Sequence, residues 1–69
     1  MIYEKDNVYY LKSGNNYEIA NIELKYNRIK KKNVLVITGS GMYENFSEDE
    51  EKEMTSYTFK ELENKICSN

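Results

Sequence analysis

One cysteine and the absence of histidine set the main limit on how this chain can fold. Cys67 is the only cysteine among 69 residues, so no disulfide can form within the chain. A structural zinc ion needs four ligands, and one thiolate without any histidine cannot supply them. Because the core of so short a chain rarely supplies more than about 3–5 kcal/mol, its apolar residues or another molecule must hold it together. Leu, Ile, Val and Phe number 15, and seven tyrosines add apolar rings, which predicts one small domain over residues 1–69.

β-Branched and aromatic residues predict an antiparallel sheet over most of the chain. The run VLVI, residues 34–37, is the most apolar and is expected in a central strand. Tyr17 and Ile19 have the opposite parity from Ile22, which predicts a β-bulge or bend near residues 20–21. Turns rich in Gly, Asn and Lys are expected at residues 13–16, 30–33 and 39–41, and they separate predicted strands at residues 8–12, 17–29, 34–38 and 42–46.

The last third of the chain carries helix signals. Thr58 and Glu61 have capping-box spacing, and Phe59, Leu62 and Ile66 recur at helical spacing. These residues predict an amphipathic helix over residues 59–67, buried against the sheet and most deeply at Leu62.

Residues 54–57 leave two alternatives. They could pair back with the fourth strand as a hairpin, or they could be helical, because Ser47 and Glu50 also have capping-box spacing. The expected fold class is α+β, with an antiparallel sheet of four to five strands in hairpins and one C-terminal helix packed on it.

The composition argues against several catalytic and ligand-binding functions. Histidine, the commonest general base, is absent, so no serine–histidine or cysteine–histidine pair can form. Cys67 has no obvious activating base and is expected to be a small apolar residue of the last helical turn. The segment TGSGMY, residues 38–43, lacks the phosphate-loop pattern and favours a tight hairpin or bulge, and SEDEEKE, residues 47–53, lacks the spacing and glycine of a calcium loop. We therefore expect no enzyme, no cofactor and no dedicated metal site.

The distribution of apolar residues indicates where in the cell the protein is expected. The longest apolar run has four residues, far short of the roughly 20 that a membrane span needs, and the first ten residues hold no apolar stretch typical of a signal peptide. A lone free cysteine also fits a reducing compartment. The sequence predicts a cytoplasmic protein without a membrane partner.

The charges are sorted into two opposite segments. The first 34 residues carry seven positive and four negative charges, and the remaining 35 carry three and eight. The acidic segment is either a solvated turn at a helix N-terminus or a surface that occupies a basic groove on a partner protein. The candidate partner-binding residues are the acidic Glu44, Glu48, Asp49, Glu50, Glu51 and Glu53 and the aromatic Tyr43 and Tyr57.

The basic segment also has two interpretations. Its lysines either protect a sheet edge from aggregation or grip phosphates, with a tyrosine stacking on a base. The candidate nucleic-acid-binding residues are Lys25, Tyr26, Arg28, Lys30, Lys31 and Lys32.

The surplus of tyrosine leads to the functional expectation. Seven rings are too many for one side of so small a core, so some must reach the surface as an interaction site or cover the second face of the sheet. The leading interpretation is a small non-enzymatic protein that occupies a partner protein, such as an inhibitor or accessory factor of a phage or mobile element. A nucleic-acid-binding module is the alternative. A homodimer is also expected, because the core is small and one strand is strongly apolar.

Overall fold

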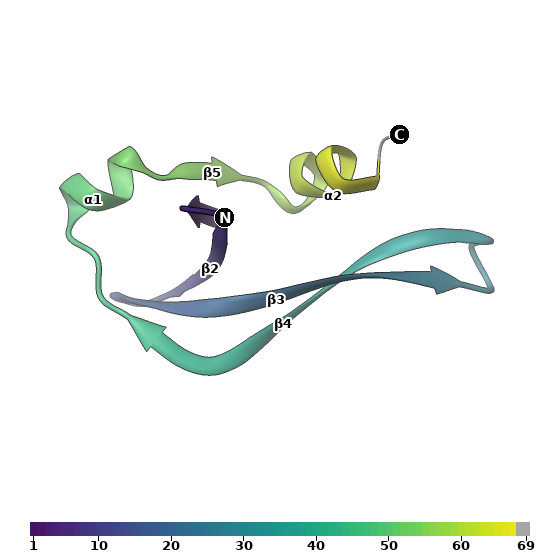
Figure 1. Ribbon diagram of the computed structural model, residues 1–69, viewed down its shortest axis with the longest axis horizontal. Helices are drawn as coiled ribbons and strands as arrows, with labels where there is room; N and C mark the ends of the chain where they lie inside the picture. The colour runs from purple at the N-terminus through teal and green to yellow at the C-terminus, as the bar shows by residue number, and fades with distance from the viewer. Residues whose placement is uncertain (68–69) are drawn as a thin grey trace.

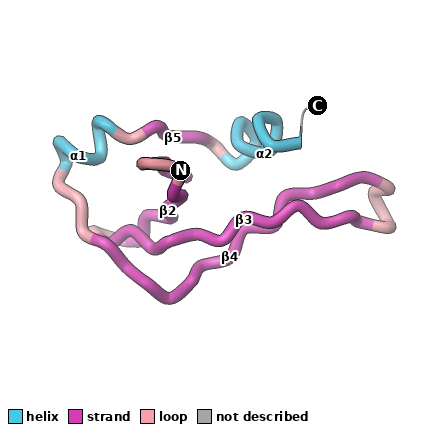
Figure 2. Tube along the Cα trace, in the orientation of Figure 1, coloured by secondary structure: helices cyan, strands magenta, loops and turns pink. Residues whose placement is uncertain are grey.

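The sheet is antiparallel throughout and carries a helix from the C-terminal part of the chain. The computed structural model describes residues 1–67 (Figures 1 and 2). The strands lie in the order β4-β3-β2-β1-β5, and every neighbouring pair is antiparallel. The predicted α+β class is therefore confirmed. The elements along the chain are β1 (Ile2–Lys5), β2 (Val8–Ser13), β3 (Asn16–Asn27), β4 (Lys32–Glu44), α1 (Glu48–Glu53), β5 (Thr55–Tyr57) and α2 (Phe59–Cys67).

The strands differ from the prediction at both ends of the sheet. β1 was not predicted, because it has four residues and is joined to β2 by only Asp6 and Asn7. Both turn residues have positive φ, 51° and 68°, which matches the tight hairpin turns whose twist suits paired strands. The strands predicted at residues 34–38 and 42–46 form one long strand, β4, which runs through the glycines at 39 and 41.

The apolar run of β4 lies at an edge of the sheet, so the prediction of a central strand was wrong. Leu35 is buried beneath α2, and Ile37 packs beside it. Val34 and Val36 point to the other face and are half-buried. The run is apolar because both faces of β4 are partly covered, not because strands flank it on both sides.

The irregularity in the β3–β4 pairing lies in β4. Pairing steps from Glu18–Tyr43 to Ala20–Gly39, so Ile19 alone faces residues 40–42. Gly41 has a φ of 80°, and its N–H donates to the Glu18 carboxylate at 2.8 Å. A Cβ at Gly39 would collide with that same carboxylate. The predicted bulge therefore exists, but it begins one residue before Ala20 and its extra residues belong to β4.

Both faces of the sheet bury apolar side chains, which explains the change of parity along β3. Ile2, Leu35 and Leu62 form one cluster, to which Ile22 adds. Tyr17 belongs to a second cluster. Because adjacent residues of a strand point to opposite faces, the tyrosine-rich cluster lies on the face opposite the one covered by α2. It contains Tyr10, Tyr17 and Met54, with Tyr3, Ile19 and Phe46 packed against them.

The two predicted capping boxes are both present. The Ser47 hydroxyl accepts from the Glu50 N–H and the Glu50 carboxylate accepts from the Ser47 N–H, each at 3.2 Å. Thr58 and Glu61 repeat the arrangement at 3.1 and 2.9 Å. Residues 48–53 are therefore helical. Both alternatives for residues 54–57 were wrong, because α1 ends at Glu53 and Thr55–Tyr57 form the strand β5, which pairs with β1 and not with the fourth strand.

Helix α2 spans the predicted residues and docks by Leu62. This side chain is 0% exposed, and Ile66 is half-buried beside it. Phe59 is 50% exposed, so the prediction that it is buried was wrong. Three residues correspond to about 300° of helical rotation, which places Phe59 at the rim of the face centred on Leu62. In the part of the chain that the structure describes, neither helix has the length and apolar character needed to cross a membrane.

Candidate functional site

The two charged segments lie at opposite ends of the molecule. The principal extents are 41 × 23 × 18 Å, and Figure 1 shows α1 and the end of β4 at one end of the long axis and the β3–β4 turn at the other. We call Glu44, Glu48, Asp49 and Glu53 the acidic end. We call Arg28, Lys30, Lys31 and Lys32 the basic tip.

Glu50 belongs to the fold more than to the surface. The Ser47 N–H and hydroxyl hold its carboxylate, and the bond from the backbone N–H contributes most to lowering the Glu50 pKa. Lys5 Nζ lies 3.8 Å from the second carboxylate oxygen. This carboxylate therefore fixes the start of α1.

Glu51 fastens α1 to the tyrosine-rich face of the sheet. Lys12 Nζ donates to both of its carboxylate oxygens at 3.2 Å. The hydroxyls of Tyr17 and Tyr3, and then Lys12, lower the Glu51 pKa. Burial raises the pKa of Tyr17, and the nearby Glu51 carboxylate raises that of Tyr3. The folded state thus favours an ionised Glu51 between neutral phenols and a lysine.

This arrangement predicts a specific dependence of stability on pH. A carboxyl whose pKa is lower in the folded state than its ordinary value of 4.5 stabilises the fold above that value. The stabilisation is lost as the pH falls through the folded pKa. Glu51→Gln should therefore lower the melting temperature at neutral pH, and the difference from the wild type should disappear in acid.

Thermal unfolding followed by circular dichroism from pH 7 downwards, over about four units, checks this result. Glu48→Gln is the matched control, because Glu48 is exposed and forms no ion pair within residues 1–67. A difference for Glu51→Gln that stays constant at every pH would show that the carboxylate charge is not what stabilises the fold.

The acidic end consists of one carboxylate at the end of β4 and three on α1. Its four side chains are exposed, and none forms an ion pair within residues 1–67. Glu44 lies opposite Tyr17, whereas the neighbouring Tyr43 lies opposite Glu18. Directly opposed residues share a face, so the Glu44 side chain is on the same face of the sheet as Tyr17. Tyr43, which is 59% exposed, is on the other face.

Tyr57 does not belong to the acidic end. Its ring packs against the cluster beneath α2, and its hydroxyl donates to Glu4 at 3.0 Å. Lys65 Nζ donates to the Tyr57 hydroxyl at 2.9 Å and to Glu4 at 3.3 Å. These bonds raise the Lys65 pKa. Tyr57 therefore ties α2 to β1, and of the two tyrosines predicted to bind a partner, the structure leaves Tyr43 as the exposed one.

The basic tip is fully exposed at the end of a hairpin. The Asn27 side-chain oxygen accepts from the N–H groups of Ile29 and Lys30, each at 2.9 Å, which fixes the turn. Behind it on β3, Lys25 pairs with Glu23 at 3.3 Å, and Tyr26 is 64% exposed. The arginine and three lysines of the tip form no ion pair within the described chain.

Sequence reasoning missed one residue of the tip. Ile29 is 93% exposed, more than any other large apolar side chain among residues 1–67. The signal was a lone apolar residue between Arg28 and Lys30, which had been assigned to the end of a strand.

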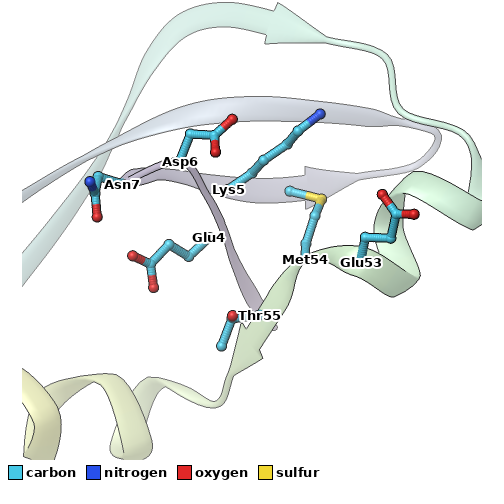
Figure 3. A pocket seen from close by; sticks show the side chains of 7 residues that line it. All are labelled: Glu4, Lys5, Asp6, Asn7, Glu53, Met54 and Thr55. Carbon is cyan, nitrogen blue, oxygen red and sulfur yellow. The ribbon is translucent and has the colours of Figure 1, made fainter.

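The molecule has shallow depressions but no converging ligand set. The depression in Figure 3, about 400 Å³, lies between the β1–β2 turn and the segment that joins α1 to β5. The carboxylates of Glu4, Asp6 and Glu53 point apart there (Figure 3). Within residues 1–67, no group of three or more acidic or cysteine side chains is placed to hold a metal ion.

No protein-family model, no curated protein and no solved structure matches this chain.

Proposed function

We propose that the protein is a non-enzymatic binding module that occupies a partner protein through its acidic end. One observation carries this proposal: the carboxylates divide into two sets. Glu50 and Glu51 are held by the fold, whereas the four of the acidic end are exposed and form no ion pair in residues 1–67. Like charges repel one another, and a positively charged partner surface relieves that repulsion.

The partner is expected to present a basic groove. Carboxylates can replace phosphates in such a groove, because long-range attraction depends on the sign and spacing of charge. A groove that normally receives nucleic acid would fit, and an inhibitor or accessory factor of a phage or mobile element would act in this way. A cytoplasmic setting and a homodimer remain predictions; the free edge of β4 offers backbone groups for self-pairing.

The proposal predicts the outcome of a capture experiment in an extract of the native host. The immobilised wild type should retain a host protein that the variant Glu44/Glu48/Asp49/Glu53→Lys releases. Glu48 and Asp49 lie in the first turn of α1, where an acid is worth on the order of 0.3–1 kcal/mol, so the capture is compared once the circular dichroism spectrum shows that the variant is folded. Retention of the same protein by a folded variant would refute the acidic end as the binding surface.

Nucleic-acid binding by the basic tip is the second candidate function. The observation that favours it is the position of four unpaired cations at the end of a projecting hairpin. Lys30→Gln and Lys31→Gly together should weaken binding of a labelled duplex, and glycine suits residue 31 because Lys31 has a φ of 56°. Neutralising Lys52 and Lys60, which are exposed on the two helices, is the matched control. Equal losses from both variants would contradict a localised site.

A further inference from the structure

The outer part of the β3–β4 hairpin is a free two-stranded ribbon. β2 pairs with β3 over residues 16–19, whereas β3 continues to pair with β4 as far as Asn27 and Lys32. Within residues 1–67, no third strand pairs with residues 21–27 or 32–38, and Figures 1 and 2 show the two segments extending past the rest of the sheet. Helix α2 packs on one face through Leu62 and Ile66. The outer residues of α2 line a shallow depression together with Leu24, Lys32 and Asn33 of the ribbon, so the opposite face and the turn are the parts that α2 leaves uncovered.

The ribbon ends in an apolar side chain ringed by cations. Ile29 is 93% exposed between Arg28 and Lys30. The Asn27 side-chain oxygen accepts hydrogen bonds from the N–H groups of Ile29 and Lys30, which hold the backbone of the turn. The exposed Ile29 side chain is therefore carried by an ordered turn. Folding offers no reason for an isoleucine here, because it contacts neither apolar cluster.

We infer that the ribbon binds double-stranded DNA, with the basic tip on the phosphates and Ile29 as a wedge between base pairs. This inference rests on the second candidate function. Strands of DNA-binding proteins enter the major or the minor groove, and from the minor groove apolar wedges such as isoleucine unstack a base step and kink the duplex. A-form RNA has a wide, shallow minor groove and is a poorer match.

The negative net charge does not oppose this binding. The chain has a net charge of −2, but its acidic end lies at the other end of a molecule 41 Å long. Charges are screened over about 8 Å at physiological ionic strength. Of the acids nearer the tip, Glu23 is paired with Lys25 and Glu63 lines a depression with Lys32, so a phosphate at the turn still meets a local excess of positive charge.

The test uses a duplex of about two helical turns with a fluorophore at each end, which reports affinity by anisotropy and bending by energy transfer. If four phosphates are contacted, the wild type should bind about a hundredfold more weakly at about 200 mM than at about 50 mM salt, and it should bring the ends closer. Ile29→Ala should keep this salt dependence but lose the bend. Met42→Ala is the matched control, because Met42 is a 63% exposed apolar residue at the far end of β4, and it should bend the duplex as the wild type does.

Three results would overturn the inference. Absence of binding at low salt to the DNA duplex, to a single strand and to duplex RNA would reject it together with nucleic-acid binding by the tip. Equal bending by the wild type and Ile29→Ala would reject the wedge and leave nucleic-acid binding intact. Tighter binding to a single strand or to duplex RNA of the same length would reject double-stranded DNA as the ligand.

Discussion

Replacing Leu62 with alanine is expected to unfold a large part of the protein at room temperature. Leu62 is 0% exposed and joins α2 to Ile2 and Leu35 of the sheet. Removing a buried leucine side chain costs about 2–5 kcal/mol, and a chain of this size rarely has more than about 3–5 kcal/mol to lose. Helix α2 has nine residues, too few to be stable without docking, so the loss should spread beyond the helix. Urea unfolding followed by circular dichroism measures the change.

Phe59→Ala is the matched control for this helix. It removes a larger side chain from the same element, but that side chain is 50% exposed. Its unfolding midpoint should therefore fall much less than that of Leu62→Ala. Equal shifts for the two variants would mean that α2 docks by a face other than the one centred on Leu62.

Tyr17→Ala is expected to be about as damaging, on the opposite face of the sheet. Tyr17 is 2% exposed, and its ring meets those of Tyr3 and Phe46 edge to face, with centroids 5.7 and 5.2 Å away. Truncating a buried aromatic ring costs on the order of 3–5 kcal/mol. The variant would also remove a hydroxyl that stabilises the ionised Glu51, so α1 should detach. Loss of the cooperative urea transition at room temperature is the expected result.

Tyr17→Phe separates the ring from the hydroxyl. It keeps the ring contacts and removes the interaction with Glu51, so it should be milder than Tyr17→Ala and should raise the Glu51 pKa toward its ordinary value. Tyr43→Ala, at a 59% exposed tyrosine, should leave the unfolding midpoint nearly unchanged. If Tyr17→Ala were as mild as Tyr43→Ala, the tyrosine-rich cluster would not be a second core.

Local signals predicted the parts of the fold that local chemistry decides. The pairs Ser47–Glu50 and Thr58–Glu61 marked the starts of both helices, because a capping box satisfies two backbone N–H groups within four residues. Leu62 followed from helical spacing. Strand β1 was missed because four residues are too few for a periodic pattern. The strand is recognised only by its pairing with β2, and the turn between them depends on positive φ angles at Asp6 and Asn7.

Global arrangement was harder to predict because the sheet is covered on both faces. The parity change along β3 was interpreted as an extra residue in that strand, on the assumption of one buried face. Tyr17 and Ile22 in fact point to opposite faces, and each meets its own cluster. VLVI was predicted to be central because it is the most apolar run, but β4 lies at an edge of the sheet. Which segment covers each face depends on contacts between residues far apart in the chain, such as Lys12 with Glu51.

The acidic segment shows the corresponding limit for the candidate site. Sequence spacing identified Glu50 as a capping residue, but nothing local showed that Glu51 would meet Lys12, 39 positions away. Tyr57 and Tyr43 were equivalent candidates from the sequence, whereas in the structure Tyr57 is half-buried and Tyr43 is exposed. The sequence could predict that acidic and basic residues are segregated along the chain. The structure shows that the two segments lie at opposite ends of the molecule.

The most direct test of the proposed function is the association rate with the host protein that the wild type retains. Glu48→Lys with Asp49→Lys changes two acids that the fold does not pair, and Lys30→Glu with Lys31→Glu makes a charge change of equal size at the other end. Electrostatic steering contributes about 10- to 1,000-fold to association, so the first variant should bind at least about tenfold more slowly and the second at no lower a rate than the wild type. Equal rates for the wild type and the Glu48/Asp49 variant would contradict the proposal that the acidic end is the working surface.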